Sequence, residues 1–370
     1  MFQLYITLGY FIPAVYIYFR VRNLFINKGY RAWYTFIYLL IVAIAPIARF
    51  THVELAGIRQ IIILASGYLI PLFLYIFLAV LLYDFFLLIN FFFKLLSKEK
   101  RNNFKYRLYT LSSIIILSIL VVVGGAININ TIQISEYRIE VPRRNSNIEN
   151  LRVAFVADFH IDRNTKLKYV NQYVRKIKEI NPDILLYGGD FVEGRADQNI
   201  NPAIINALKS IGTKYGAYGI NGNHEYYGSA NPGSFYVKTG AVLIRDEMIK
   251  IEQSFYLAGR VDDMVEDRKT VNEIVRNTSD LPVLLLDHRP TQLQEASRTP
   301  ANVQFSGHTH NGQMFPLNFF LKRMYELSWG YKKIKNTHFF VTSGLRLWGP
   351  PVKTAGKSEI MLVDIEFKNR

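Results

Sequence analysis

The chain has 370 residues, enough for two domains, and 50% of them are hydrophobic, a share that is high for a purely water-soluble protein. It contains no cysteine, which excludes disulfides, thiolate metal ligands and a cysteine nucleophile. The formal net charge of +15 would suit a nucleic-acid-binding protein, but many basic residues lie in short segments beside apolar stretches, where membrane topology accounts for them better.

Apolar stretches dominate the first third of the chain and predict a membrane domain over residues 1–126. Four of them are predicted to be transmembrane helices, at residues 2–18, 33–47, 61–93 and 111–126. As one helix, the third stretch would overshoot the ~30 Å hydrocarbon core of a bilayer. It therefore tilts, protrudes, kinks near Pro71 or folds into two short spans.

Basic residues predict the orientation of these spans. The connectors at residues 20–31 and 94–107 are strongly basic, whereas the loop around His52 carries little net charge. If residues 61–93 cross the membrane once, the positive-inside rule places both basic connectors in the cytoplasm. Both termini, and everything after residue 126, then lie on the non-cytoplasmic side of a cell membrane. Two crossings by residues 61–93 would move the rest of the chain to the other side.

Beyond the apolar part, residues 127–150 are polar and charged, and we predict a linker there. Over residues 151–370, short apolar runs alternate with amphipathic stretches, which is typical of an α/β domain. A helix is predicted from Leu167 to Asn181 because its apolar residues recur at helical spacing. Buried strands are predicted at residues 152–157, 184–187, 217–220, 283–286, 303–305 and 339–342.

Five clusters of polar residues directly follow predicted strands, and five of the seven histidines lie in them. The clusters are Asp158-Phe159-His160, Gly188-Gly189-Asp190, Gly222-Asn223-His224-Glu225, Asp287-His288 and Gly307-His308-Thr309-His310. Ligands of α/β sheets bind at the carboxyl ends of strands, where loops converge. A single histidine or aspartate would most simply be a core or surface residue. Five ordered clusters at strand ends indicate one shared pocket.

In this order, the clusters resemble the signature of the calcineurin-like metallophosphoesterase superfamily: D-x-H, G-D, G-N-H-E, a lone His and G-H-x-H. The sequences GHTHNGQMFP, SGLRLWGPPVK and SEIMLVDI are similar to those of its bacterial membrane-attached members. The resemblance covers about the whole of residues 151–370. It implies a four-layer α/β/β/α metallophosphoesterase sandwich that follows the N-terminal transmembrane helices.

The resemblance also implies a site for two divalent metal cations, with seven ligands drawn from all five clusters. One metal would be held by Asp158, His160 and His310, the other by Asn223, His288 and His308, and Asp190 would bridge them. Imidazole, carboxylate and amide ligands suit Mn, Fe, Zn or Ni and fit Ca poorly. His224 would be the catalytic residue, as transition-state stabiliser or general acid. Glu225 would orient a ligand or His224.

The implied function is that of a membrane-anchored phosphoesterase that hydrolyses phosphodiester or pyrophosphate bonds through a metal-bridging hydroxide. Its partners would be the membrane and a phosphate-ester substrate, lipid-linked or not. Nucleic acid is not an expected partner, because no reader motif is present. Two alternatives stay open: a phosphomonoesterase, including a phosphoprotein phosphatase, and a non-catalytic membrane scaffold of the same fold. The complete set of expected ligands favours an enzyme over a scaffold.

Residues 315–335 mix aromatic and basic side chains, among them Phe319, Phe320, Lys322 and Arg323. Such a mixture can bind single-stranded nucleic acid. In a membrane-anchored chain, a surface that rests on anionic lipid is favoured over that interpretation. An ordinary insertion packed on its own domain fits the pattern at least equally well.

Overall fold

The computed structural model describes residues 2–50, 57–194, 200–227, 229, 231–276, 278 and 280–369, with the side chains of 2–8 and 49–50 left out. The loop around His52 lies outside the described residues. The chain divides into a helical unit, Met1–Ile127 with Gly349–Thr354, and a sheet unit, Asn128–Trp348 with Ala355–Arg370.

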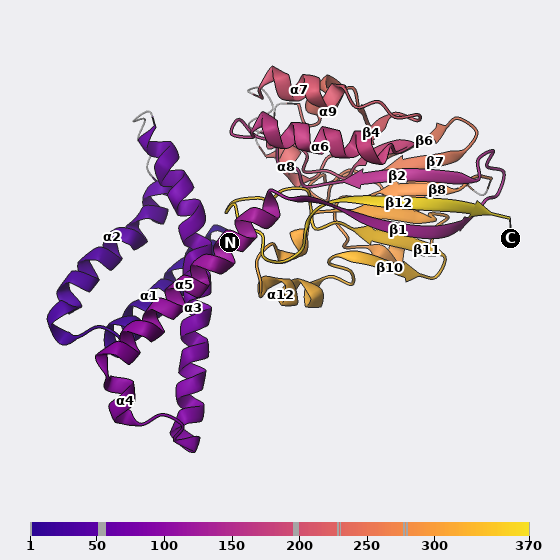
Figure 1. Ribbon diagram of the computed structural model, residues 1–370. Helices are drawn as coiled ribbons and strands as arrows, with labels where there is room; N and C mark the ends of the chain where they lie inside the picture. The colour runs from indigo at the N-terminus through magenta and orange to yellow at the C-terminus, as the bar shows by residue number, and fades with distance from the viewer. Residues whose placement is uncertain are drawn as a thin grey trace. The chain divides into compact units, whose positions relative to one another are not determined.

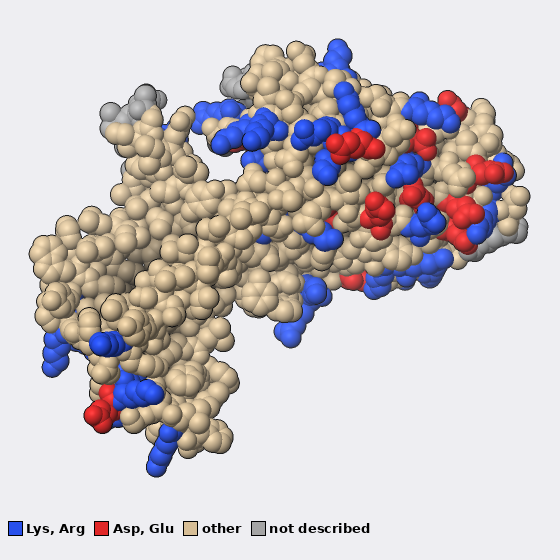
Figure 2. Space-filling model, viewed as in Figure 1, with Lys and Arg blue, Asp and Glu red and all other residues tan. Residues whose placement is uncertain are grey.

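The helical unit is built from long apolar helices (Figure 1). Its elements are α1 (Phe2–Leu24), η1 (Lys28–Tyr30), α2 (Arg31–Phe50), α3 (Ile58–Phe93), α4 (Lys98–Asn102) and most of α5 (Phe104–Ile129). Among the described residues, three segments are helical, long and apolar enough to cross a membrane: Lys28–Ala48, Ile58–Phe93 and Phe104–Ile129. Figure 2 shows the face of these helices almost devoid of charged side chains. The first predicted span falls in α1, a helix whose first residues, 2–8, are described by their backbone alone.

The third predicted span forms one continuous helix, α3, with Pro71 inside it. Its 36 residues correspond to about 54 Å at the rise of an α-helix, well beyond the ~30 Å of a hydrocarbon core. The structure therefore provides the single helix that one crossing requires, while the side of the membrane on which each end lies stays a prediction.

An ion pair joins α1 to α3. Nε of Arg20 donates a 2.8 Å hydrogen bond to Oδ2 of Asp84, and a second guanidinium nitrogen contacts Oδ1 of the same carboxylate. The hydroxyl of Tyr16 also donates to Asp84. Charged side chains among apolar helices are costly unless they are paired. Each charge here has its partner on the neighbouring helix.

The sheet unit contains two six-stranded sheets, in the orders β1-β12-β2-β3-β4-β5 and β10-β11-β9-β8-β7-β6 (Figure 1). The strands are β1 (Ile132–Pro142), β2 (Asn150–Val156), β3 (Ile184–Tyr187), β4 (Ala217–Gly219), β5 (Val242–Leu243), β6 (Glu247–Ile251), β7 (Phe255–Gly259), β8 (Val283–Leu286), β9 (Val303–Ser306), β10 (Gly330–Ile334), β11 (Thr337–Val341) and β12 (Ser358–Lys368). Strands β2 to β5 run parallel, as do β7, β8, β9 and β11.

Helices cover the outer faces of the two sheets: α6 (Leu167–Ile180), α7 (Pro202–Lys209) and α9 (Ser234–Lys238) on one, α10 (Val271–Val275) and α11 (Leu293–Ala296) on the other. The remaining helical elements of the unit are α8 (Asn223–Tyr226), η3 (His310–Gly312) and α12 (Leu317–Met324). On β2, Val153 and Phe155 face the core between the sheets, whereas Ala154 and Val156 face the core under α6 and α7. The same alternation on β8 fills the central core and the core under α10 and α11. These layers confirm the predicted α/β/β/α sandwich.

Most of the predicted elements are present. Strands β2, β3, β4, β8, β9 and β11 lie at the six predicted places, within a few residues at their ends. Helix α6 ends at Ile180 and is capped by Asn181, whose φ of 43° is left-handed, directly before Pro182. A left-handed residue followed by a proline is a common way to stop a helix.

The segment at residues 127–150 differs from the predicted linker. It contains β1, which pairs in parallel with β12 from Ile132↔Ser358 to Pro142↔Lys368. Ile132, Ile139 and Val141 are buried, while charged residues between them point outward. These outward charges make the segment look like a linker in composition, although its buried residues belong to the cores of the sheet unit.

Candidate metal centre

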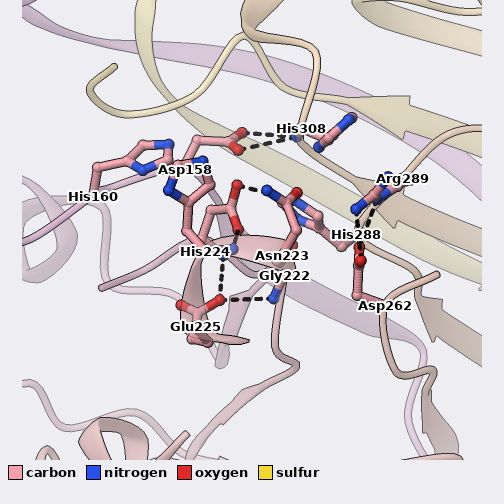
Figure 3. A network of polar contacts seen from close by, with 12 residues as sticks. Asp158, His160, Gly222, Asn223, His224, Glu225, Asp262, His288, Arg289 and His308 are labelled. Carbon is pink, nitrogen blue, oxygen red and sulfur yellow. Dashed lines mark hydrogen bonds and ion pairs between the residues drawn. The ribbon is translucent and has the colours of Figure 1, made fainter. Parts of the chain in front are cut away.

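All seven predicted ligands and His224 lie just beyond the carboxyl ends of strands from both sheets. Asp158 and His160 follow β2, Asp190 follows β3, Asn223 and His224 begin α8 after β4, His288 follows β8, and His308 and His310 follow β9. Because parallel strands end at the same edge of a sheet and the two sheets pack face to face, these side chains gather in one place. Figure 3 shows six of them: Asp158, His160, Asn223, His224, His288 and His308.

In the part of the chain that the structure describes, three groups of side chains bring ligand atoms within 4.8 Å of one another: Asp158, His160 and His310; Asp190, His288 and His308; and His160, Asp190 and His224. The first group is the set predicted for one metal. The second contains the predicted bridging residue and two of the three ligands predicted for the other metal.

The third predicted ligand of that metal is an amide, Asn223. Its Nδ2 donates to the hydroxyl of Tyr227 at 3.2 Å. Its Oδ1 is buried and has no hydrogen-bond partner among the described residues. A buried amide oxygen without a donor is costly, so this atom is suited to a cation.

Two Nε2 atoms in the cluster lie close to another atom that can bind a cation. Nδ1 of His288 lies 2.7 Å from the carbonyl oxygen of Gly188, so it carries the proton, and Nε2 lies 3.2 Å from Oδ2 of Asp190. Nε2 of His160 lies 3.2 Å from Nε2 of His310. Such contacts are favourable when a proton or a metal cation lies between the atoms. The donor set therefore fits divalent cations.

The pKa values of two histidines in the cluster also fit a site for cations. Burial by itself lowers the pKa of His288, but the carboxylates of Asp190 and Asp158 raise it to about 10. Burial and the neighbouring His288 and Arg289 lower the pKa of His308 to about 3. The carboxylate side of the cluster attracts positive charge, while His308 stays neutral and able to act as a ligand.

The ligand loops adopt an uncommon backbone conformation. Five of the predicted ligands have left-handed φ: Asp158 (56°), His160 (50°), Asp190 (51°), His308 (71°) and His310 (49°). This region costs a non-glycine residue roughly 1–2 kcal/mol. It persists only where surrounding contacts impose it, and residues of this kind concentrate at functional sites.

Backbone contacts between the loops impose these conformations. The amide of Asp158 donates to the carbonyl of Gly189 at 3.0 Å, and the amide of His160 donates to the carbonyl of Asp190 at 3.0 Å. Gly222 is required by close approach, because an added Cβ would meet the carboxylate of Asp190 and lie 2.7 Å from Cε1 of His288. The loops after β2, β3 and β4 therefore hold one another.

Glu225 ties the loop after β3 to the loop after β4. Its buried carboxylate accepts hydrogen bonds from the backbone amides of Asp190 (2.9 Å), Phe191 (2.5 Å), Val192 (3.1 Å) and Gly222 (2.8 Å). The side chain thus acts through the backbone of Asp190, in the orienting role expected of it, and is a positioning residue.

Glu193 was not predicted to take part in the site. Its Oε1 lies 2.8 Å from Nδ1 of His160, and its Oε2 lies 3.0 Å from Nδ1 of His224. Burial by itself raises the pKa of Glu193, but the two histidines lower it to about 2. The carboxylate therefore keeps protons on both Nδ1 atoms and turns both Nε2 atoms toward the cluster. In the sequence, Glu193 is only an acidic residue three positions after Asp190, and this pattern is too common to predict a role in the site.

His224 lies between the cluster and two exposed aromatic rings. Its backbone amide donates to Oδ1 of Asp190 at 2.7 Å. Its ring contacts those of Tyr227 and Trp348, with centroids 5.0 and 6.1 Å away. Burial works to lower the pKa of His224, but the hydrogen bond to Glu193 and the charge of Asp190 raise it overall.

The basic residue beside His288 is already paired. Arg289 donates two hydrogen bonds of 2.7 Å to the buried carboxylate of Asp262 (Figure 3). One residue earlier, Asp287 is paired with the buried Arg260 at 3.3 Å. These ion pairs hold the loop that carries His288. Arg289 and Asp287 therefore have a structural role, and the reactive groups are those of the histidine-carboxylate cluster.

Comparisons with known proteins show similarity to metallophosphoesterases. A family model described as "Calcineurin-like phosphoesterase" matches residues 151–312. An uncharacterized metallophosphoesterase of Helicobacter pylori (strain J99) is 27% identical over 232 residues, covering 60% of this chain and 61% of that protein. One of Campylobacter jejuni is 26% identical over 281 residues, covering 74% of each. A "Transmembrane protein with metallophosphoesterase domain" of Danio rerio is 26% identical over 273 residues, covering 68% of this chain and 61% of that protein.

Proposed function

We propose that this chain, whose residues 151–312 match the calcineurin-like phosphoesterase family model, is a membrane-anchored, metal-dependent hydrolase of phosphodiester or pyrophosphate bonds. The observation that carries the proposal is the convergence of carboxylates and imidazoles from both sheets into one buried cluster, where their ligand atoms lie close together. Relatives named as metallophosphoesterases, one of them a transmembrane protein, support it.

The residues that would hold two divalent cations are the two predicted sets, with Asp190 common to both. When bound, such cations supply Lewis-acid activation of a water molecule and neutralise charge on a phosphate group. The protein's own contribution is a rigid set of donors. Glu225 and the loop-to-loop hydrogen bonds hold Asp158 and Asp190 in place before any substrate binds.

His224 is the group best placed to act on the substrate. Glu193 holds Nδ1, so Nε2 is the nitrogen left to meet a phosphoryl oxygen or the leaving oxygen. A ring fixed in this way can stabilise charge on the phosphoryl group or donate a proton to the departing oxygen. The exposed rings of Tyr227 and Trp348 beside it offer an apolar contact to the organic part of an ester.

The apolar helices support anchoring in a cell membrane. We propose that the sheet unit lies on the non-cytoplasmic side, because the two basic connectors favour the cytoplasm. A membrane-anchored hydrolase meets substrates at the bilayer, which favours a phosphate ester carried by a lipid as its substrate.

Metal analysis and a substrate screen of the purified full-length protein test the proposal. We expect two bound divalent cations per chain and faster turnover of diester or pyrophosphate substrates than of monoesters, with Asp190→Asn as the inactive control. Monoesters turned over faster than all other substrates would favour the phosphomonoesterase alternative. Two metals per chain with no turnover of diester, monoester or lipid pyrophosphate would favour the scaffold.

A further inference from the structure

Helix α12 (Leu317–Met324) presents an apolar stripe to the outside of the sheet unit. None of its residues is buried. Leu317, Phe320, Leu321 and Met324 recur at the spacing of one helix face. Phe320 is 62% exposed and Met324 is 73% exposed. Figure 1 shows α12 at the margin of the unit, outside the sheets.

The insertion that contains α12 is therefore packed only in part. Further along, Trp329 donates a 2.7 Å hydrogen bond from its indole nitrogen to the buried Glu359, and Ser328 is buried. This anchors the second part of residues 315–335 to the domain. The first part, with α12, keeps its apolar face in contact with solvent, so the ordinary packed insertion describes only the second part.

Basic side chains border the apolar stripe. Lys322 and Arg323 are exposed on α12, and neither has an acidic partner among the described residues. The adjacent Phe319 is 53% exposed. A short helix with an apolar face, exposed phenylalanines and flanking cations has the composition of a helix that lies in the interface of an anionic bilayer.

We propose that α12 lies in the surface of an anionic lipid bilayer, with Leu317, Phe320 and Met324 below the headgroups and Lys322 and Arg323 among them. The same chain carries three segments apolar enough to span a membrane, which would tether the sheet unit to a bilayer. The stripe is mainly aliphatic, whereas stacking of nucleic-acid bases needs flat aromatic platforms in a basic groove.

The position of α12 gives the contact a consequence for the site. The turn η3 begins at His310, a predicted ligand, and packs against the start of α12. An added Cβ at Gly312 would lie 2.7 Å from the backbone nitrogen of Asn318, so the turn and the helix touch closely. Seating α12 among headgroups brings the metal centre near the level at which lipid phosphates lie.

A single labelled cysteine tests the proposal, because the natural chain has none. Phe320→Cys in the full-length protein is labelled with an environment-sensitive fluorophore, with Val237→Cys on α9, 69% exposed, as the matched control. Each protein is placed singly in nanodiscs of phosphatidylcholine with or without phosphatidylglycerol. Aqueous iodide and nitroxide-bearing lipids serve as quenchers. No activity is measured, so the outcome is independent of the proposed phosphoesterase function.

We expect the label at position 320 to be quenched by lipid nitroxide and shielded from iodide when phosphatidylglycerol is present, and the label at position 237 to stay accessible to iodide. Lys322→Glu with Arg323→Glu should abolish the shielding, and Lys209→Glu on α7 should not. Equal accessibility at positions 320 and 237 overturns the proposal. So does shielding from iodide without quenching by lipid, which means that protein covers α12, or shielding that appears only when a single-stranded oligonucleotide is added.

Discussion

Oε2 of Glu193 lies 3.0 Å from Nδ1 of His224, while Oε1 of the same carboxylate lies 2.8 Å from Nδ1 of His160. One side chain therefore orients both a predicted ligand and the proposed catalytic residue. Glu193→Gln removes the charge and leaves only one oxygen acceptor for two ring N–H groups. We expect turnover to fall by about 10–100-fold, as for other partners of metal-bound histidines.

The readout for Glu193→Gln is turnover of diesters with good and poor leaving groups, together with metal content. A misoriented His224 should slow poor leaving groups more than good ones. Glu179→Gln on α6, which removes an exposed pair with Arg175 at 4.0 Å, should change neither value. A variant that loses only thermal stability would show that Glu193 is structural.

His224→Ala should retain its metals and lower turnover by about 10²–10⁴-fold, the range for a lost acid–base group. Metal content by mass spectrometry and rates across a leaving-group series check this together. A larger loss for poor leaving groups indicates proton donation, and equal losses indicate stabilisation of phosphoryl charge. Loss of metal from this variant would make His224 a ligand, contrary to the role proposed here.

Asp190→Asn should lose most of its bound metal and nearly all activity. Asp190 is the carboxylate shared by two of the three ligand groups, so its replacement removes the negative charge that both sets need. Titration with metal, followed by calorimetry and activity, measures the effect. Two metals per chain at unchanged turnover would refute the shared bridge.

Gly222→Ala should disable the site without adding any charge. The new Cβ would meet the carboxylate of Asp190 and lie 2.7 Å from Cε1 of His288, so one of them must move. Displacements of about 1 Å at an active site can cost on the order of 10² in rate. Gly212→Ala, where nothing lies within 4 Å of the added Cβ, is the control and should behave as the natural chain. Equal rates for the two variants would contradict the close approach.

Reporter proteins fused to the chain can determine on which side of the membrane the sheet unit lies. A reporter active only outside the cytoplasm should score positive after Arg370 and negative near Lys98, which belongs to a basic connector. A fluorescent protein that folds only in the cytoplasm should give the opposite pattern. Cytoplasmic fluorescence after Arg370 would reverse the topology and direct the substrate search to cytoplasmic phosphate esters.

Sequence alone predicts the parts of the fold that local pattern determines. Fully buried strands such as β3 and β8 are short apolar runs, and the residues that follow them are the polar ones that gather at the site. The end of α6 at Asn181 and Pro182 is equally local. For these elements, the residues that stabilise or end the strand or helix can be recognised from the sequence itself.

Features that depend on contacts between distant segments are harder to predict. Glu193 matters because two loops carry His160 and His224 to its two oxygens, and nothing at its own position shows this. The outward charges of β1 mask its strand pattern in the sequence. Its partner β12 comes at the other end of the unit in sequence, although the two strands pair in the sheet. The left-handed backbone at Asp158 follows from neighbouring loops rather than from residue type.

The pairing of β1 with β12 affects how the protein is made. Ser358, the partner of Ile132, leaves the ribosome on the order of 200 residues later, at roughly 5–20 residues per second. For that time, ~10–40 s, the first sheet lacks the strand that joins β1 to β2. Nascent chains emerging beside a membrane with unpaired strand edges are prone to aggregation. A chaperone that shields β1 and β2 during synthesis would therefore raise the yield of folded protein.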